Sequence, residues 1–308
     1  MYAIIGITGN VGGSTARALL KDGKKVRGIV RDKGKAASWE TAGAELAVAD
    51  VGDAAAMELA LRDVEGVFVM IPPNFAPSPD YSETRAIIAA LRRAISAVRP
   101  PKVVYLSSVG AHRTSGLGLI TQSHILEQEM SFLVVPSAFI RAAWFLENHQ
   151  WDVSAARQRG EIDAFLSPPD RRIPMVATDD IGRLAAKTLQ ETWNGNRYLE
   201  LEGPARYSPL DTAAAFSRVL DRTVVVKPVP RNEWQAYFEN QGAVPQRTLP
   251  RIEMLDGFNS GWITFEGGNG CEHIVGSQTL EEVLKALLWD GPGNNGMVRR
   301  ETELTETP

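Results

Sequence analysis

The stretch YAIIGITGNVGG, from Tyr2 to Gly13, decides the fold class. Its apolar first half has the length of a β-strand, and the glycines Gly6, Gly9 and Gly12 follow before a segment with helical apolar spacing. Glycine permits a tight turn, and it lets backbone N–H groups approach a pyrophosphate at the positive N-terminus of a helix. The spacing differs from the usual Gly-x-Gly-x-x-Gly, but the strand–turn–helix order predicts a dinucleotide-binding loop. The alternative is a glycine turn that only packs the helix on the strand.

Strand and helix patterns alternate along the first half of the chain. Apolar runs predict strands at 2–8, 25–30, 44–49, 66–71, 102–107 and 132–140. Helical spacing predicts helices at 13–21, 54–61, 81–98 and 124–130. Strands that alternate with helices form βαβ units, and near-continuous apolar strands fit a parallel sheet that is covered on both faces. The pattern therefore predicts an α/β fold.

The second half of the chain is less regular. Helices are predicted at 144–159, at 179–192 with Asp179 or Asp180 near the cap, and at 208–220. Strands are predicted at 198–201 and 223–229, a turn-rich segment at 163–173, and further helices between 231 and 288. The last residues are rich in Gly, Asn and Glu, which indicates a frayed tail. We divide the chain into 1–150, with a return strand near 197–202, then 151–290, and a flexible tail at 291–308.

Composition excludes several classes of protein. The chain has 308 residues, with 44% hydrophobic and 23% charged residues, as in ordinary globular proteins. Its net charge of −4 gives no general attraction to nucleic acid or to an anionic membrane. No apolar run approaches the ~20 residues of a membrane helix, and the N-terminus has no signal-peptide pattern. Cys271 is the single cysteine, so we expect no intrachain disulfide and a cytoplasmic protein.

The ends of the second and third predicted strands bear on the cofactor. At the end of the second strand, an acidic residue commonly holds the ribose of NAD, whereas an arginine accommodates the 2′-phosphate of NADP. Here Arg31 falls at that position, Asp32 follows, and Lys35 is close by. The sequence therefore favours NADP(H) over NAD(H), and the alternative is a solvated Arg–Asp loop pair. Asp50 ends the third strand, where it either accepts from the adenine amino group or takes part in helix capping with Asp53.

The usual catalytic pair of such reductases is missing. No tyrosine is followed four residues later by a lysine, so there is no Tyr-x-x-x-Lys proton donor. Ser107 ends the fifth strand, where a substrate-orienting serine is expected, and a neutral His124 on the next helix has a side chain suited to a ribose hydroxyl. We therefore assign candidate catalytic and cofactor-binding roles to Ser107 and His124. No metal site is predicted, because metal-ligand spacing is absent from the other histidines, which are His112, His149 and His273.

Seven segments, taken in order, resemble the NmrA-like family of atypical short-chain dehydrogenases/reductases over roughly residues 2–230. They are GITGNVG at 6–12, VRGIVR at 26–31, VFVMIPP at 67–73, VVYLSSVGA at 103–111, HILE at 124–127, RxxWFxEN at 141–148 and PMVATDDIG at 174–182. That family includes NAD(P)H:quinone reductases, triphenylmethane reductases and redox-sensing regulators. It often carries a lysine or histidine on the helix after the fifth strand, a position that falls on Ser123 or His124 here.

The resemblance implies a Rossmann-type doubly wound parallel sheet with a smaller α+β C-terminal substrate domain. Residues 1–150 would then bind NAD(P), and 151–290 would mostly bind substrate. Expected cofactor-binding residues are Gly6, Thr8, Gly9, Asn10, Val11, Gly12, Arg31, Lys35, Asp50, Val51, Ile71, Pro72, Pro73, Ser107 and His124. Expected substrate residues are Phe75, Trp144, Phe145 and Asn148.

Two functions follow as hypotheses. The first is an NAD(P)H-dependent oxidoreductase that transfers hydride to a quinone-like or other conjugated small molecule. Such an acceptor needs no strong protein acid if conjugation stabilises its reduced anion and water protonates it. The alternative is an NADP(H)-binding redox sensor that acts through a regulatory protein partner. An aryl-ether or isoflavone-type reductase is disfavoured by the missing lysine. We expect a small-molecule substrate and a homodimer or regulatory partner, and neither direct nucleic-acid binding nor membrane binding.

Overall fold

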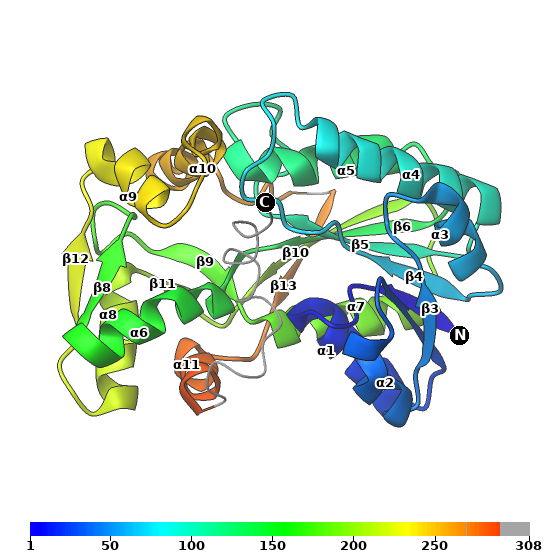
Figure 1. Cartoon of the computed structure of the whole chain (residues 1–308), viewed down its shortest axis with the longest axis horizontal. Coiled ribbons are helices and arrows are strands. Elements are labelled where there is room, and N and C mark those ends of the chain that lie inside the picture. Colours follow the sequence, from blue (N-terminus) through cyan, green and yellow to red (C-terminus); the bar gives the residue numbers. More distant parts are fainter. Residues whose placement is uncertain (269, 290–308) are drawn as a thin grey trace, which may run out of the picture.

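A computed structural model of the chain describes residues 1–268 and 270–289. Its centre is an eight-stranded sheet in the order β13-β10-β6-β5-β4-β1-β2-β3, and every neighbouring pair is parallel (Figure 1). The strands in chain order are β1 (Tyr2–Ile5), β2 (Val26–Val30), β3 (Glu45–Val48), β4 (Gly66–Val69), β5 (Val103–Ser108), β6 (Ser137–Ala142), β10 (Asn196–Glu202) and β13 (Cys271–Val275). The predicted Rossmann-type α/β class is confirmed.

Two apolar cores cover the two faces of the sheet. Side chains alternate along a strand, so Tyr2 and Ile4 enter one core while Ala3 and Ile5 enter the other. The first core is closed by α1 (Asn10–Lys21) and α7 (Thr178–Gln190), and the second by α3 (Ala54–Ala60), α4 (Ser82–Val98) and α5 (Thr121–Met130), as Figure 1 shows. Burial on both faces explains why the central strands are apolar without a polar alternation.

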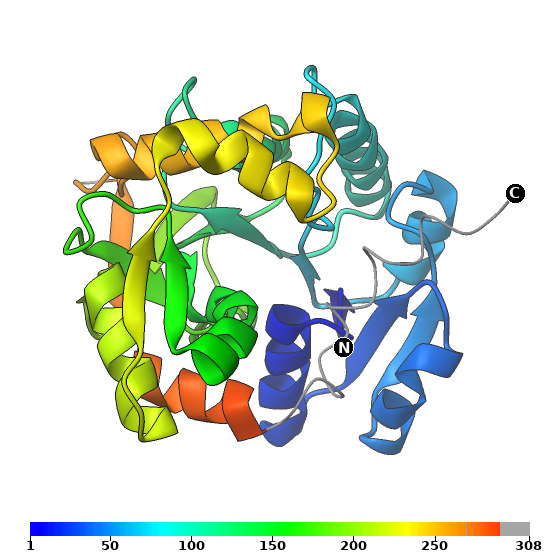
Figure 2. The same ribbon diagram turned by 60° about the vertical axis from the view of Figure 1, so that its left-hand side comes forward.

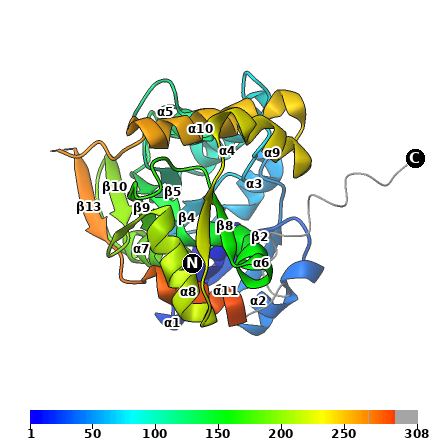
Figure 3. The same cartoon turned by 90° about the vertical axis from the view of Figure 1, so that its left-hand side faces the viewer.

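A second lobe lies beyond the carboxyl ends of the strands (Figure 2). It contains a three-stranded sheet in the order β11-β9-β7 and a parallel pair, β12-β8. These strands are β7 (Trp144–Phe145), β8 (Glu161–Ala164), β9 (Ile173–Val176), β11 (Arg206–Tyr207) and β12 (Val225–Pro228). The helices are α6 (Gln150–Arg159), α8 (Pro209–Leu220), α9 (Trp234–Asn240), α10 (Leu249–Ser260) and α11 (Leu280–Trp289). Figure 3 shows α9 and α10 on the side of the lobe opposite α8 and α11.

Short elements complete the described chain. Helix α2 (Ala37–Thr41) follows β2, and five 3₁₀ turns lie between larger elements. They are η1 (Gly34–Ala36), η2 (Gly118–Ile120), η3 (Leu146–His149), η4 (Arg231–Glu233) and η5 (Pro245–Arg247). Across residues 1–268 and 270–289, no helix is both long and apolar enough to cross a membrane. The tail predicted at 291–308 lies outside the described residues.

The strand predicted at 132–140 starts too early. Strand β6 begins at Ser137, and the side chains of Phe132 and Val134 are 79% and 99% exposed in the preceding loop. Pro136 has no N–H to give to a ladder, but its carbonyl accepts from Val103 N at 2.9 Å and so aligns β6 with β5. The apolar run therefore extends further than the buried strand.

The single helix predicted at 144–159 is confirmed only for residues 150–159. Residues Trp144 and Phe145 form β7, because they pair with Met175 and Val176 of β9, and the helix begins at Gln150 after a 3₁₀ turn. The segment predicted as turn-rich at 163–173 likewise contains the end of β8 and the start of β9. Tertiary pairing overrides helical spacing here.

Between 231 and 288 the prediction of helices alone misses β13. This strand pairs with β10 at the edge of the main sheet, and its pattern Cys-Glu-His-Ile-Val leaves three of five side chains exposed. An edge strand with so few buried side chains lacks the apolar signature of the inner strands.

Helix α7 obtains its cap from a distant residue. The predicted Asp179 and Asp180 lie in its first turn, but the N-cap is Ala177, whose side chain has no hydrogen-bonding group. Instead the carboxylate of Glu147 accepts from Thr178 N at 2.9 and 3.0 Å and from Thr178 Oγ1 at 2.6 Å. Burial raises the pKa of Glu147. The segment after β6 is thereby attached to the helix that covers the sheet.

Candidate functional site

The glycine loop between β1 and α1 has the geometry of an anion-binding turn. Gly6 has a φ of +75°, and a Cβ on Gly12 would lie 2.2 Å from Gly6 O, so the fold itself requires glycine at both positions. Gly9 differs, because an added Cβ would meet only Gly6 O at 3.4 Å. It is the N-cap of α1 with an extended backbone, and the first turn carries no acidic side chain. The positive end of α1 is therefore accessible to an anion.

The remaining loop residues divide by exposure. Thr8 is exposed beside Gly9, and Asn10 is half-buried as the first residue of α1. Val11 is buried in the first core, so its backbone N–H, and not its side chain, is suited to a phosphate contact.

Arg31 and Asp50 follow neighbouring parallel strands, β2 and β3, at the same edge of the sheet. Arg31 and Lys35 are exposed, whereas Asp32 Oδ1 accepts from Gly34 N at 2.8 Å in a local turn. Asp50 Oδ1 similarly accepts from Gly52 N at 2.8 Å.

Asp53, not Asp50, caps α3. It accepts from the N–H groups of Ala55 and Ala56. Val51, between the two acids, is half-buried against the second core. Asp50 thus stabilises the turn before the helix.

The segment after β4 is held against α5. Gln122 Nε2 donates to Asn74 O at 2.9 Å, and Tyr81 Oη donates to Gly118 O at 2.8 Å. Ile71 is half-buried within this segment. Its exposed residues include Pro72, Pro73 and Phe75.

Ser107 is linked to α5 through Glu127, not through His124. Its buried hydroxyl donates to Glu127 Oε1 at 2.5 Å, and Glu127 pairs with Arg141 at 2.8 Å. Because the hydroxyl proton of Ser107 is used in this hydrogen bond, the Ser107 oxygen can only accept a hydrogen bond from another group. His124 lies one turn before Glu127, and its Nδ1 donates to Ala111 O at 2.8 Å, which leaves Nε2 for other contacts.

Arg141 is the centre of a buried ionic cluster at the carboxyl ends of β5, β6 and β10. Its guanidinium is 4% exposed, binds Glu127 and Glu266, and lies 3.8 Å from Glu200. It also stacks over the Tyr198 ring at 4.4 Å. The hydrogen bond from Arg141 lowers the pKa of Glu266. One cation thus offsets part of the charge of three carboxylates.

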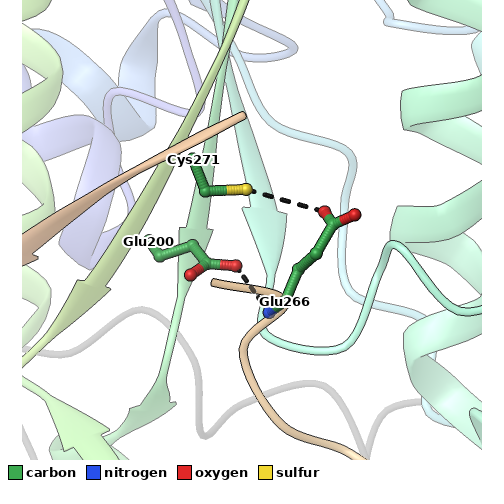
Figure 4. Close-up of side chains that lie close together, drawn as sticks. All are labelled: Glu200, Glu266 and Cys271. Carbon is green, nitrogen blue, oxygen red and sulfur yellow. Dashed lines mark hydrogen bonds between the residues drawn. The ribbon is translucent and has the colours of Figure 1, made fainter. Parts of the chain in front are cut away.

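Glu200, Glu266 and Cys271 lie close together in this cluster (Figure 4). In the described residues they are the one set of acidic, cysteine or histidine groups with ligand atoms near enough to hold a metal ion. Glu200 instead accepts from Glu266 N at 2.7 Å, and burial raises the pKa of the Cys271 thiol to about 11. Since the Arg141 guanidinium already supplies positive charge, we assign the trio a structural role.

A cavity of about 410 Å³ lies in the second lobe. Three of the four expected substrate residues line it, namely Phe75, Trp144 and Asn148. The Trp144 ring is fixed by an edge contact with Phe258 at 5.2 Å. Phe145 packs against the first core instead. The other walls come mainly from α6, β8, α9 and α10.

The cavity wall includes polar pairs that the sequence analysis missed. His149 Nδ1 lies 2.9 Å from Asp152 Oδ2, and Tyr237 Oη donates to Asp163 Oδ2 at 2.7 Å. The first pair has a sequence signal, because His and Asp three residues apart share a face where a helix begins. The second has none, since its partners are 74 residues apart.

The NmrA-like family matches residues 2–253 of the chain. The chain belongs to the NmrA-like family. Among curated relatives of this NmrA-like chain, quinone oxidoreductase 2 of Escherichia coli (strain K12) is 24% identical over 296 residues, which are 94% of this chain and 99% of that protein. NAD(P)H azoreductase of Xenophilus azovorans is 25% identical over 224 residues, 73% and 75% of the two chains.

Solved structures of similar fold include two reductases. The NADPH complex of an NADPH-dependent quinone oxidoreductase from Escherichia coli has a TM-score of 0.77 at 22% identity, over 93% of this NmrA-like chain and 99% of that one. The triphenylmethane reductase of Citrobacter sp. has a TM-score of 0.75 at 20% identity, with the same coverage. At these identities the likeness establishes the fold.

We expect Arg141→Met to lower the free energy of unfolding of the NmrA-like chain by about 3–5 kcal/mol, because it leaves buried carboxylates without their cation. The matched control is Arg92→Met, whose pair with Glu129 is exposed and is worth about 0–1 kcal/mol. Urea unfolding at neutral pH measures both.

The difference between wild type and Arg141→Met should shrink on acidification. Arg141 lowers the pKa of Glu266, so the stability from this pair is present above the ordinary carboxyl range and is lost as the pH falls through the lowered pKa. Equal losses in the two arginine variants at neutral pH would contradict the role given to Arg141.

Proposed function

We propose that the chain is an NADPH-dependent oxidoreductase that transfers hydride to a quinone-like or other conjugated small molecule. The proposal rests on one observation: the glycine loop and the aromatic cavity both lie at the carboxyl edge of the main sheet. The glycine loop follows the carboxyl end of β1, and the aromatic cavity includes Phe75 and Trp144, which follow β4 and β6 in the same parallel sheet. Ligands of doubly wound sheets bind outside this edge.

The cofactor end of the proposal rests on Gly9 and Arg31. Gly9 has room for a side chain within the fold, so a close approach of a phosphate is a reason for glycine there. Arg31 and Lys35 place exposed cations where a 2′-phosphate would lie, while the carboxylate of Asp32 is engaged with Gly34 N. These features favour NADP(H), and the relative solved with NADPH supports the same cofactor class.

The acceptor end rests on the cavity. Aromatic side chains from several elements line it, which suits a flat conjugated molecule; they are Phe75, Trp144, Trp151, Phe165, Tyr237 and Phe238. The similar proteins are named as a quinone oxidoreductase, an azoreductase and a triphenylmethane reductase, and quinones, azo compounds and triphenylmethane dyes are flat conjugated molecules of this kind. Hydride comes from the nicotinamide when the cofactor is bound, and the chain's part is to position the acceptor against it.

Ser107 and His124 would act on the cofactor side. The Ser107 hydroxyl donates its hydrogen bond to Glu127, so it would accept a hydrogen bond from the nicotinamide portion. His124 would use Nε2 toward a ribose hydroxyl while Nδ1 stays on Ala111 O. Ile71, Pro72 and Pro73 would lie beside the same ribose.

Gly9→Val should weaken NADPH binding at least about 100-fold and leave the fold intact, because the extended backbone at Gly9 accepts any residue while the added bulk would block the phosphate. The control is Gly270→Val, where an added Cβ meets no atom within 4 Å. Fluorescence titration with NADPH and circular dichroism measure the two effects. Unchanged affinity in Gly9→Val would rule out this loop as the pyrophosphate site.

Arg31→Ala should weaken NADPH about 10- to 150-fold and NADH far less, since one charge-assisted contact is worth about 1.5–3 kcal/mol. Arg93→Ala, which removes an exposed arginine from α4, serves as the control. Calorimetric titration with both nucleotides gives the ratio. An equal loss for the two nucleotides would indicate that Asp32 governs the pocket and that NAD(H) is the ligand.

Trp144→Ala should raise KM or lower kcat for a quinone acceptor while the affinity for NADPH stays within about twofold of wild type. The reason is that Trp144 forms cavity wall and belongs to none of the loops assigned to the nucleotide. Anaerobic NADPH oxidation measures this, with the exposed Trp289→Ala as the control. Tight NADPH binding without oxidation by any quinone, imine or enone would instead favour the redox-sensor hypothesis.

A further inference from the structure

The wall of the cavity contains one imidazole held by a carboxylate. His149 ends η3 and Asp152 lies in the first turn of α6, and both side chains line the cavity next to Asn148. Their side chains are 13% and 23% exposed, and Nδ1 of His149 is 2.9 Å from Oδ2 of Asp152. The carboxylate acceptor places a hydrogen on Nδ1 and directs Nε2 away from the pair.

The second nitrogen of this imidazole is unsatisfied. His149 Nε2 is enclosed and has no hydrogen-bond partner among the described residues. A buried polar atom without a partner is destabilising, so such an atom calls for an explanation. On the described lining of the cavity, Nε2 is the one enclosed side-chain nitrogen or oxygen in this condition.

The other ionisable groups of the wall are engaged. The Tyr237 hydroxyl of α9 donates a hydrogen bond to Asp163 of β8. Burial together with this carboxylate raises the pKa of Tyr237, which makes it a poor acid. Arg159 of α6 pairs with Glu161 at 2.8 Å. Arg251 of α10 lies over the Phe238 ring at 4.1 Å. No arginine is a practical proton donor.

We infer that His149, positioned by Asp152, donates a proton to the acceptor after hydride transfer. This inference rests on the proposed function. Hydride from NADPH adds two electrons and one hydrogen to a neutral quinone or azo compound and leaves NADP⁺ and an anion. The N–H bond at Nε2 of the imidazolium breaks, the proton forms an O–H or N–H bond on that anion, and His149 recovers a proton from water.

The carboxylate of Asp152 suits this step. Asp152 fixes the orientation of the imidazole ring, as a carboxylate does in other acid–base pairs, and so directs Nε2 away from itself. Nε2 is enclosed in the structure, so the step requires the side chains around it to move when the acceptor enters the cavity. The step also supplies the acid that the missing Tyr-x-x-x-Lys pair would have provided.

The test compares acceptors that need this proton with one that does not. A quinone and an azo dye become anions on hydride transfer. Crystal violet, a triarylmethane cation, becomes a neutral molecule and needs no proton. His149→Gln should lower kcat for the quinone and the azo dye about 10- to 100-fold and leave crystal violet reduction within about twofold of wild type. Circular dichroism and NADPH titration check the fold and the cofactor site.

Two further variants complete the experiment. Asp152→Asn keeps the imidazole and removes its carboxylate, so it should show the same selectivity with a smaller loss, and it provides the test if His149→Gln fails to fold. His273→Gln makes the same exchange at an exposed histidine outside the cavity lining and should behave as wild type.

The outcomes separate the two proposals. Equal losses for all acceptors, or no loss for any, would overturn proton donation by His149 while the reductase activity of the wild type stands. A wild-type protein that binds NADPH and reduces none of the three acceptors would overturn the proposed function and, with it, this inference.

Discussion

All strands of the main sheet run in one direction, so their carboxyl ends lie at one edge, and the candidate site depends on this constraint. The glycine loop, Arg31 and the segment that contains Phe75 each follow a different strand to that edge. The common direction of the strands therefore brings residues that are remote in sequence to the same edge, even where these residues do not contact one another. The second lobe contributes the cavity that lies beyond the same edge.

Buried charge connects the edge strands of the main sheet with one another and with the helices beside them. Arg141 joins α5, β6 and β10 through Glu127 and Glu200, and it reaches the segment before β13 through Glu266. Asp180 in α7 accepts from the N–H groups of Ser277 and Gln278, which follow β13. Such interactions are costly to break from one side, because the remaining partner stays buried. They hold β6, β10 and β13 in one geometry.

The inner half of the fold is readable from the sequence, and the outer half much less so. Inner strands such as β1 and β4 are buried on both faces, which gives a continuous apolar run. The edge strand β13 lacks that signature. The glycine spacing predicts the loop because backbone geometry requires particular residues. The sequence predicts Trp144 in a helix, since its pairing with Met175 depends on a chain segment 31 positions away. It misses His149 because the spacing to Asp152 indicates a pair but not the cavity that the pair lines.

The central claim is that this chain passes hydride from a bound nicotinamide to an acceptor in the cavity. It is tested most directly by anaerobic incubation with crystal violet and each of the two stereoisomers of NADPH that carry deuterium at C4. Mass spectrometry and NMR of the colourless product locate the label. We predict one deuterium on the central carbon with one stereoisomer and hydrogen with the other. Product without deuterium from either stereoisomer would contradict the account, and so would a protein that binds NADPH but reduces neither crystal violet nor a quinone nor an azo dye.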